Sequence, residues 1–277
     1  MQIRKVIMIL NISKYIFYVL FLETLSLNPT IAFDDLASQN SKDRLENILT
    51  HVSRANNPAL AEDYCNEIRG LKAKKNELVD PSIQYVFVLS GRSSYLKEPV
   101  DGPDVEDLED DYNRIELGIE TAKSVVRAQL NKSEITQEDM QHYGPTIIYN
   151  GRSKHNEDLE KALNDRTLSH YPKDKFRILE IGEASTRGQF ISLKKDYPLS
   201  HTSVAVITHA YHFPRVGRMI GSKWHPFGDE TKVFFYLVDR DFKAPGSSED
   251  IMREVERISR YIENGDLNIS ISPEIIF

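Results

Sequence analysis

Five short apolar runs, each followed by a longer amphipathic stretch, constrain the fold of this chain more than any other feature. The runs are rich in β-branched and aromatic residues, which is typical of strands buried on both faces. They are Tyr85–Leu89, Pro145–Tyr149, Phe176–Ile181, Ser203–Thr208 and Lys232–Val238. Strands that alternate with helices predict parallel βαβ units, and therefore an α/β fold with a doubly wound, mostly parallel five-stranded sheet.

Residues 1–32 precede this alternation and have the order of a secretory signal peptide. Arg4 and Lys5 begin the segment, Tyr15–Leu22 is its apolar run, and Ala32 stands at the expected cleavage site. The run is too short to cross a bilayer alone, since about 20 apolar residues are needed. An uncleaved anchor in the inner membrane is the alternative, and it would keep the protein near the membrane. A cleaved signal peptide predicts a periplasmic or secreted protein, and under both interpretations the domain lies outside the cytoplasm.

The remaining chain divides into a helical N-terminal segment, 33–80, and an α/β domain, 81–277. Within 33–80 a helix is expected from about Pro58, because proline is favoured in a first helical turn. In the domain, the amphipathic pattern after the first strand begins at Asp111, preceded by the acidic stretch Asp101–Asp111. That stretch lacks the spacing of an EF-hand, so we expect a solvated loop.

Composition excludes several classes of function. The formal net charge of −7 offers no basic surplus to neutralise phosphates, so no nucleic-acid partner is expected. A lone cysteine, Cys65, excludes a disulfide framework and a multi-cysteine zinc site. His209 and His212 lie three residues apart, but no third ligand with metal spacing accompanies them, so no metal site is expected.

Polar residues follow four of the five predicted strands, where open parallel sheets bind their ligands. Glycine permits close backbone approach, helix N-termini offer N–H donors, and arginine binds phosphate or carboxylate in a bidentate fashion. The residues are Gly91 and Arg92 after the first strand, Asn150, Gly151 and Arg152 after the second, Glu183, Ser185 and Thr186 after the third, and His209, His212 and Arg215 after the fourth. The sequence therefore predicts a pocket for a small ligand that carries phosphate or carboxylate.

These residues also have structural interpretations. Ser185 and Thr186 can cap the helix that follows them. The glycines can be ordinary turn residues with no role in ligand binding, because no Walker or GxGxxG pattern is present. His212 can act as an acid or base near neutral pH, with Glu183 orienting it, or it can brace its own loop by hydrogen bonds.

One segment of the chain carries a specific resemblance. Val206–Arg215, VITHAYHFPR, resembles the last motif of the YdcF/SanA/ElyC family of domains of unknown function, a strand ending in Thr followed by an aromatic-His pair and an Arg. Other segments are similar to the family's motifs in the same order: Val88–Gly91, Asn113-Arg114, Asn150–Arg152 with Glu157, and Glu183–Thr186. The resemblance extends over about Gln84 to Ile262. Arg152 departs from it by replacing a glycine, and Asn150 stands where serine is usual.

The resemblance implies a Rossmann-like three-layer α/β/α sandwich, a pocket over the strand ends to which Arg114 contributes, and a role at the bacterial cell envelope. The family has no settled reaction. We therefore expect a protein that binds a small anionic ligand, with hydrolase or transferase activity left open. The alternatives are a non-catalytic envelope factor that recognises a lipid-linked precursor or a protein partner, and an S-adenosylmethionine-binding protein, because one member is reported to bind that cofactor. Cofactor and oligomeric state are unknown from the sequence.

Overall fold

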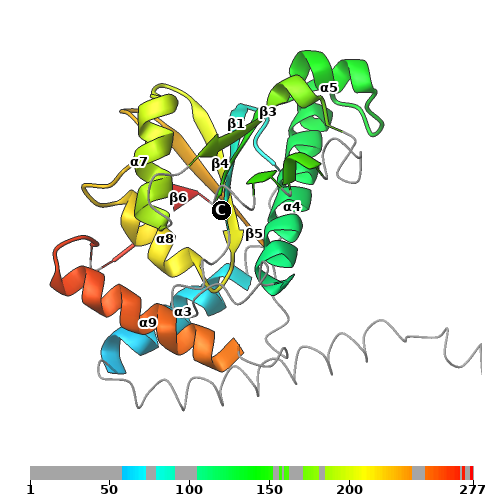
Figure 1. Ribbon diagram of the computed structural model, residues 1–277. Helices are drawn as coiled ribbons and strands as arrows, with labels where there is room; N and C mark the ends of the chain where they lie inside the picture. Colours follow the sequence, from blue (N-terminus) through cyan, green and yellow to red (C-terminus); the bar gives the residue numbers. More distant parts are fainter. Residues whose placement is uncertain are drawn as a thin grey trace, which may run out of the picture.

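The apolar runs of the sequence form one parallel sheet at the centre of the protein (Figure 1). The computed structural model describes residues 58–72, 79–90, 105–151, 156–157, 159–161, 171–180, 185–238, 247–268, 270–271 and 275–276. The strands are β1 (Ile83–Leu89), β2 (Thr146–Gly151), β3 (Phe176–Glu180), β4 (Ser203–His209), β5 (Lys232–Val238) and β6 (Ile275–Ile276), in the spatial order β3-β2-β1-β4-β5-β6. The expected Rossmann-like α/β sheet is confirmed, and the short β6 adds an edge strand that was not predicted.

Helices cover both faces of this sheet (Figure 1). They are α3 (Pro58–Lys72), α4 (Val105–Leu130), α5 (Gln137–Tyr143), α7 (Thr186–Asp196), α8 (Phe213–Ile220) and α9 (Ser247–Glu263). The helix expected from Pro58 is confirmed. Helix α5 was not predicted; its start is fixed by a capping box in which Thr136 and Asp139 bond each other's backbone N–H groups. The helix expected after β2 is described only in part, at 156–157 and 159–161.

Alternate residues of each strand point to opposite faces and bury two separate cores. On β1, Val86 and Val88 pack with the buried face of α4, whereas Phe87 and Leu89 pack with α3, α7, α8 and α9. These four strand residues are fully buried. A strand buried on both faces is continuously apolar, which explains why the sequence shows runs rather than alternation.

Helix α4 begins earlier than its apolar pattern predicts. It starts at Val105, so the expected solvated loop over Asp101–Asp111 is wrong from residue 105 onward. Acidic residues are favoured in the first turns of a helix, where the partial positive charge of the N-terminus attracts them. Asp111 itself is only 2% exposed, and it is paired with Arg114 one turn later. Residues 101–104 lie outside the described residues.

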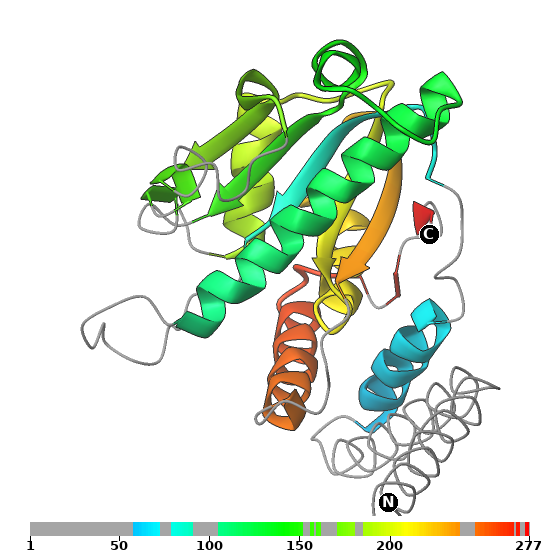
Figure 2. The same ribbon diagram turned by 90° about the vertical axis from the view of Figure 1, so that its right-hand side faces the viewer.

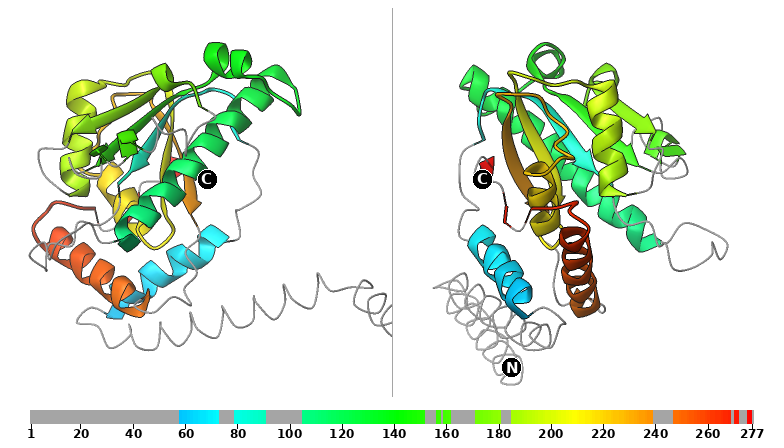
Figure 3. Two further views of the ribbon diagram at one scale, coloured as in Figure 1. Left: turned by 45° about the vertical axis from the view of Figure 1, so that its right-hand side comes forward. Right: turned by 90° about the vertical axis from the view of Figure 1, so that its left-hand side faces the viewer.

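Helices α3 and α9 lie at the carboxyl end of the sheet, next to α8 (Figures 2 and 3). The predicted site residues lie at the same edge, because in a parallel sheet all strands end on one side. The segment 1–32, expected to be a signal peptide or anchor, lies outside the described residues. Within the part of the chain that the structure describes, no helix combines the length and apolar character needed to cross a membrane.

Gly118 allows α4 to approach the sheet closely. A Cβ atom at this position would lie 2.9 Å from Val88 Cγ2 and 3.5 Å from Val86 Cγ1. We expect Gly118→Ala to lower the free energy of unfolding by roughly 1 kcal/mol, because overpacking costs about 1–3 kcal/mol and the better helix propensity of alanine returns up to about 1 kcal/mol. Urea denaturation measures this change. Asn113→Ala, at an exposed position of α4, is the control and is expected to be neutral or stabilising. A Gly118→Ala protein as stable as the control would contradict the tight packing.

Candidate functional site

The carboxyl ends of β1 and β4 lie side by side at the point where the sheet changes its direction of winding. From β1 the chain winds through β2 to β3, and from β4 it winds the opposite way through β5 to β6. Val88 and Ile207 are in register near these two ends. Open α/β sheets bind ligands in the crevice outside such a switch point. The residues around the ends of β1 and β4 therefore form the candidate site.

Arg114 is buried beside the end of β1, with 1% of its surface exposed. Its Nε donates to His209 Nδ1 at 2.6 Å, and its Nη1 donates to the Leu89 carbonyl at 3.1 Å and to Asp111 Oδ1 at 3.4 Å. Arginine has no acceptor atom, so His209 Nδ1 must carry a lone pair, and the proton of the neutral ring is on Nε2. Helix α4 thus places a cation against the last residue of β4.

Tyr149 completes this first cluster from β2. Its Oη donates to Asp111 Oδ2 at 2.6 Å. Burial, and next the negative charge of Asp111, raise the pKa of Tyr149 well above its ordinary value, so the phenol remains a donor. The nearby Gly151, predicted as a ligand-binding turn residue, leaves space for this ring: a Cβ atom there would lie 2.5 Å from Tyr149 Oη. The structure thus gives Gly151 a packing reason for lacking a side chain.

His212 is the centre of a second cluster, at the start of α8. Its Nε2 accepts a hydrogen bond from Arg215 Nη2 at 2.8 Å, and its Nδ1 lies 3.0 Å from Thr208 Oγ1. Because Nε2 must carry a lone pair, the neutral ring has its proton on Nδ1 and donates it to Thr208. Thr186 Oγ1 lies 3.2 Å from the same Nε2 and accepts from Arg215 Nη1 at 3.0 Å.

Glu254 of α9 balances the charge of Arg215. Arg215 Nε and Nη2 donate to its two carboxylate oxygens at 2.7 and 3.2 Å, and Arg257 donates to Oε1 at 2.8 Å. Burial works against the charged form of Glu254, but Arg215 and Arg257 outweigh it and lower the pKa of this carboxyl. Burial likewise opposes the charge of Arg215, but Glu254 outweighs it and raises the pKa of the guanidinium. The pair is therefore ionised and fully engaged.

The protonation state of His212 follows from this environment. Burial lowers the pKa of His212 well below 6.5, and the charges of Arg215 and Arg114 lower it further. The ring is therefore neutral at pH 7, with both nitrogens engaged inside the protein. This arrangement is that of a histidine that braces its loop. The acid or base role of His212 stays a prediction, and it requires Arg215 to leave Nε2 first.

Asn150, at the end of β2, presents a buried acceptor without a partner. Its Nδ2 donates to the Gln189 carbonyl at 3.1 Å, which fixes the orientation of the amide. The side chain of Gln189 in turn accepts from the Ser90 N–H group at 3.0 Å. Within the described part of the protein, Asn150 Oδ1 is buried and makes no hydrogen bond. Such an acceptor costs about 1–3 kcal/mol when unpaired, so it favours a ligand that brings a donor.

The other predicted site residues have mixed outcomes. Ser185 caps α7, because its Oγ accepts from the Gly188 N–H group at 3.0 Å, and the capping interpretation is confirmed for this residue. The remaining predicted residues lie at the same edge of the sheet in three groups: Arg114 with His209, Thr186 with His212 and Arg215, and Asn150 with the Gln189 carbonyl. Gly91, Arg92, Arg152 and Glu183 lie outside the described residues.

Sequence reasoning missed several members of the two clusters. Asp111, Tyr149, Gln189, Thr208 and Glu254 were not assigned to the site. Asp111 lies three residues before Arg114, a spacing that places both on one helix face and could have indicated the pair. Glu254 lies 39 positions after Arg215. No local pattern connects two residues that far apart, so only the tertiary fold reveals this partner.

The described side chains of the site carry a positive surplus. Arg114, Arg215 and Arg257 contribute three positive charges, and Asp111 and Glu254 contribute two negative charges, which leaves one positive charge. In the described part of the chain, no group of three or more His, Cys, Asp or Glu residues is arranged to hold a metal ion. The expectation that no metal site exists is a prediction that the undescribed residues leave open.

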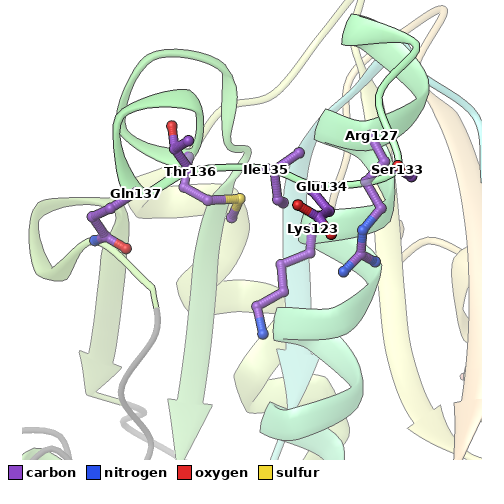
Figure 4. Close-up of a pocket in the computed structure, with 8 residues that line it drawn as sticks. Lys123, Arg127, Ser133, Glu134, Ile135, Thr136 and Gln137 are labelled. Atoms are coloured by element: carbon purple, nitrogen blue, oxygen red, sulfur yellow. The ribbon is translucent and has the colours of Figure 1, made fainter.

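A cavity of about 490 Å³ lies elsewhere, between the last turns of α4 and the start of α5 (Figure 4). Lys123 and Arg127 extend along it from α4, with Gln137 on the other side. Helix α4 ends where β2 is about to begin, so this cavity lies at the amino edge of the sheet. Two of its polar side chains already have partners: Lys123 pairs with Glu120 at 2.6 Å, and Thr136 caps α5. It is separate from the candidate site.

The depressed pKa of His212 predicts a loss of stability in mild acid. Below pH 6.5 the unfolded chain binds a proton at this histidine and the folded protein does not, so the free energy of unfolding falls as the pH falls. One such group contributes up to about 1.4 kcal/mol per pH unit. We expect urea denaturation between about pH 8 and pH 5 to show this slope in the natural protein. His212→Gln, whose side-chain oxygen can still accept from Arg215, is expected to flatten it.

The exposed His142 supplies the control, because His142→Gln makes the same substitution at a solvent-exposed histidine outside the site. Equal slopes for His212→Gln and the natural protein would show that His212 titrates normally and is not buried as described.

Comparison with known proteins returned no match. No protein-family model matches the chain, no curated protein matches it, and no solved structure matches it. The similarity of Val206–Arg215 to the YdcF/SanA/ElyC motif therefore stays an interpretation of the sequence, and the function has to be argued from the site itself.

Proposed function

We propose that the protein binds a small anionic molecule over the carboxyl ends of β1, β2 and β4, with Arg114 as its main cationic contact. The observation that carries this proposal is the state of the Arg114 guanidinium. It is buried, Nε and Nη1 are used to hold it in place, and no hydrogen bond joins its Nη2 to the described residues. A buried cation with unused donors at a switch point favours an anionic ligand.

Arg215 is a weaker candidate for direct contact. Its donors are directed to Glu254, Thr186 and His212, so a ligand would have to compete with a bidentate carboxylate. We therefore assign Arg215 to the framework of the site and Arg114 to the ligand. The net positive charge of the described side chains supports the same sign of ligand.

Asn150 adds a second requirement to the ligand. Its buried Oδ1 can only accept a hydrogen bond, and a fully ionised phosphate or carboxylate has no donor to offer. A molecule that carries an anionic group and a neighbouring hydroxyl or amine, such as a sugar phosphate or a hydroxy acid, satisfies both Arg114 and Asn150. If the protein is exported, we expect its ligand to be a compound that occurs outside the cytoplasm.

Ligand-dependent stabilisation of the full-length protein tests the proposal. We expect one or more of inorganic phosphate, ribose 5-phosphate, citrate and undecaprenyl phosphate to raise the melting temperature, because a hundred-fold excess over Kd stabilises a folded protein by about 2.7 kcal/mol. The undecaprenyl phosphate sample distinguishes a lipid-linked precursor from a free metabolite. Titration calorimetry then gives Kd for each compound that stabilises the protein.

The matched variants are Arg114→Gln and Arg127→Gln, which remove one positive charge each from the same helix. Arg127 is half-buried at the far end of α4, away from the site, and its loss is expected to leave Kd unchanged. Loss of Arg114 is expected to raise Kd about ten- to hundred-fold, the value of one charge-assisted hydrogen bond. Asn150→Asp is a second variant, and its new negative charge is expected to weaken anion binding as well. Folded Arg114→Gln and Asn150→Asp proteins that bind as tightly as the natural protein would refute the proposal.

A further inference from the structure

Helix α3, which precedes the sheet in the sequence, reaches the loop that carries both histidines of the site. Tyr64 of α3 is fully buried, and its Oη donates a hydrogen bond to the carbonyl of Tyr211. Tyr211 lies between His209 and His212 in the chain, in the connection from β4 to α8. The hydroxyl of Tyr64 therefore holds the peptide that separates the two histidines.

The side chain of Tyr211 lies against both of these rings. Its ring centroid is 5.4 Å from that of His209 and 6.4 Å from that of His212, and the two interplanar angles are 34° and 26°. His209 is the acceptor for Arg114, and His212 is the acceptor for Arg215. The position of Tyr211 therefore affects the partners of Arg114 and Arg215.

An ion pair between the half-buried Glu67 and the buried Arg218 attaches α3 to α8, the helix that follows this connection. Glu67 accepts two hydrogen bonds from Arg218, at 2.6 and 2.7 Å. Arg218 is 1% exposed and also donates to the Pro214 carbonyl in the first turn of α8, at 2.9 Å. Burial raises the pKa of Glu67, and the charge of Arg218 opposes that rise. Breaking such a pair leaves a buried charge without its partner, which is strongly destabilising.

Apolar packing supports these polar contacts. Leu60, Tyr64 and Ile68 recur every four residues, form one face of α3 and belong to the same buried core as α8 and α9. Figures 2 and 3 show α3 next to α9 at the carboxyl end of the sheet, where the site lies. The core of the α/β domain therefore includes α3.

We propose that α3 is a clamp that positions the β4–α8 connection: Tyr64 fixes the Tyr211 peptide, Glu67 fixes Arg218, and the two contacts together orient His209 and His212 toward the arginines. None of the α3 residues is assigned to the ligand. Only the effect of the clamp on ligand binding rests on the proposed function. The positioning of the connection is measured without any ligand.

Hydrogen exchange measured by mass spectrometry on the full-length protein tests the clamp. Tyr64→Phe removes one hydroxyl and keeps the ring, so we expect amide exchange in peptides covering 209–216 to become about ten-fold faster. Exchange in β1 and β2 is expected to stay unchanged, which separates a local positioning role from a general loss of stability. Tyr143→Phe, at an exposed tyrosine of α5, is the matched control and should change neither region.

Glu67→Gln and Glu62→Gln form a second matched pair on α3. Glu62 is exposed, whereas Glu67 is paired with Arg218. Only Glu67→Gln is expected to accelerate exchange at the start of α8. The clamp is refuted if Tyr64→Phe and Glu67→Gln leave 209–216 protected, or if they accelerate exchange equally throughout the protein. If no ligand is found in the binding experiments, the exchange result still stands. If exchange becomes faster but Kd does not change, α3 positions the loop without affecting ligand binding.

Discussion

Two buried arginines at one edge of the sheet are the constraint on which the rest of the site depends. A guanidinium taken out of water needs partners for its donors. A buried guanidinium that loses its charged partner costs several kcal/mol of stability. Arg114 and Arg215 meet part of this need in the same way, because each donates to a histidine nitrogen as well as to a carboxylate. A histidine that accepts from arginine must be neutral at that nitrogen. The arginines therefore determine the protonation of the histidines around them.

The same constraint explains why helices distant in the sequence cover this edge. The β4–α8 connection joins His209, the last residue of β4, to His212 at the start of α8, and contacts from other helices help to hold it. Helix α9 supplies Glu254 to Arg215, and α3 supplies Tyr64 to the Tyr211 carbonyl. Each of these two helices contributes a polar group that the connection lacks, together with apolar residues that belong to the common core. The candidate site is thus assembled from the first and the last described helices as well as from the strand ends.

Sequence periodicity predicted the sheet because its strands are buried on both faces. A residue such as Phe87 or Val88 is apolar whichever face it occupies, so the five long strands appear as continuous runs. Strand β6 has two residues, too few to form a recognisable run. The start of α4 was misplaced because its first turns are acidic rather than amphipathic, and acids there are stabilised by the end of the helix, not by the core.

The candidate site was predictable only where it follows strand ends. Asn150, Thr186, His209 and His212 were found because a parallel sheet brings those positions together. The partners that decide their chemistry come from elsewhere: Glu254 has no sequence pattern that links it to Arg215. Sequence alone therefore indicated that an arginine lies at this edge, but not which one is already neutralised.

The two arginines differ in how completely a carboxylate neutralises them, and this difference decides where positive charge remains. Glu254 binds Arg215 through both carboxylate oxygens, whereas Asp111 meets Arg114 through one oxygen at 3.4 Å and gives its other oxygen to Tyr149. A carboxylate shared in this way compensates Arg114 less completely, because part of its hydrogen-bonding capacity is used by a phenol. Among the described side chains, the positive charge that remains is therefore on the α4 side of the β1 end. Under the proposed function, an anion bound outside the strand ends is attracted to Arg114, while the hydrogen bond from Arg215 holds the neutral His212 in place.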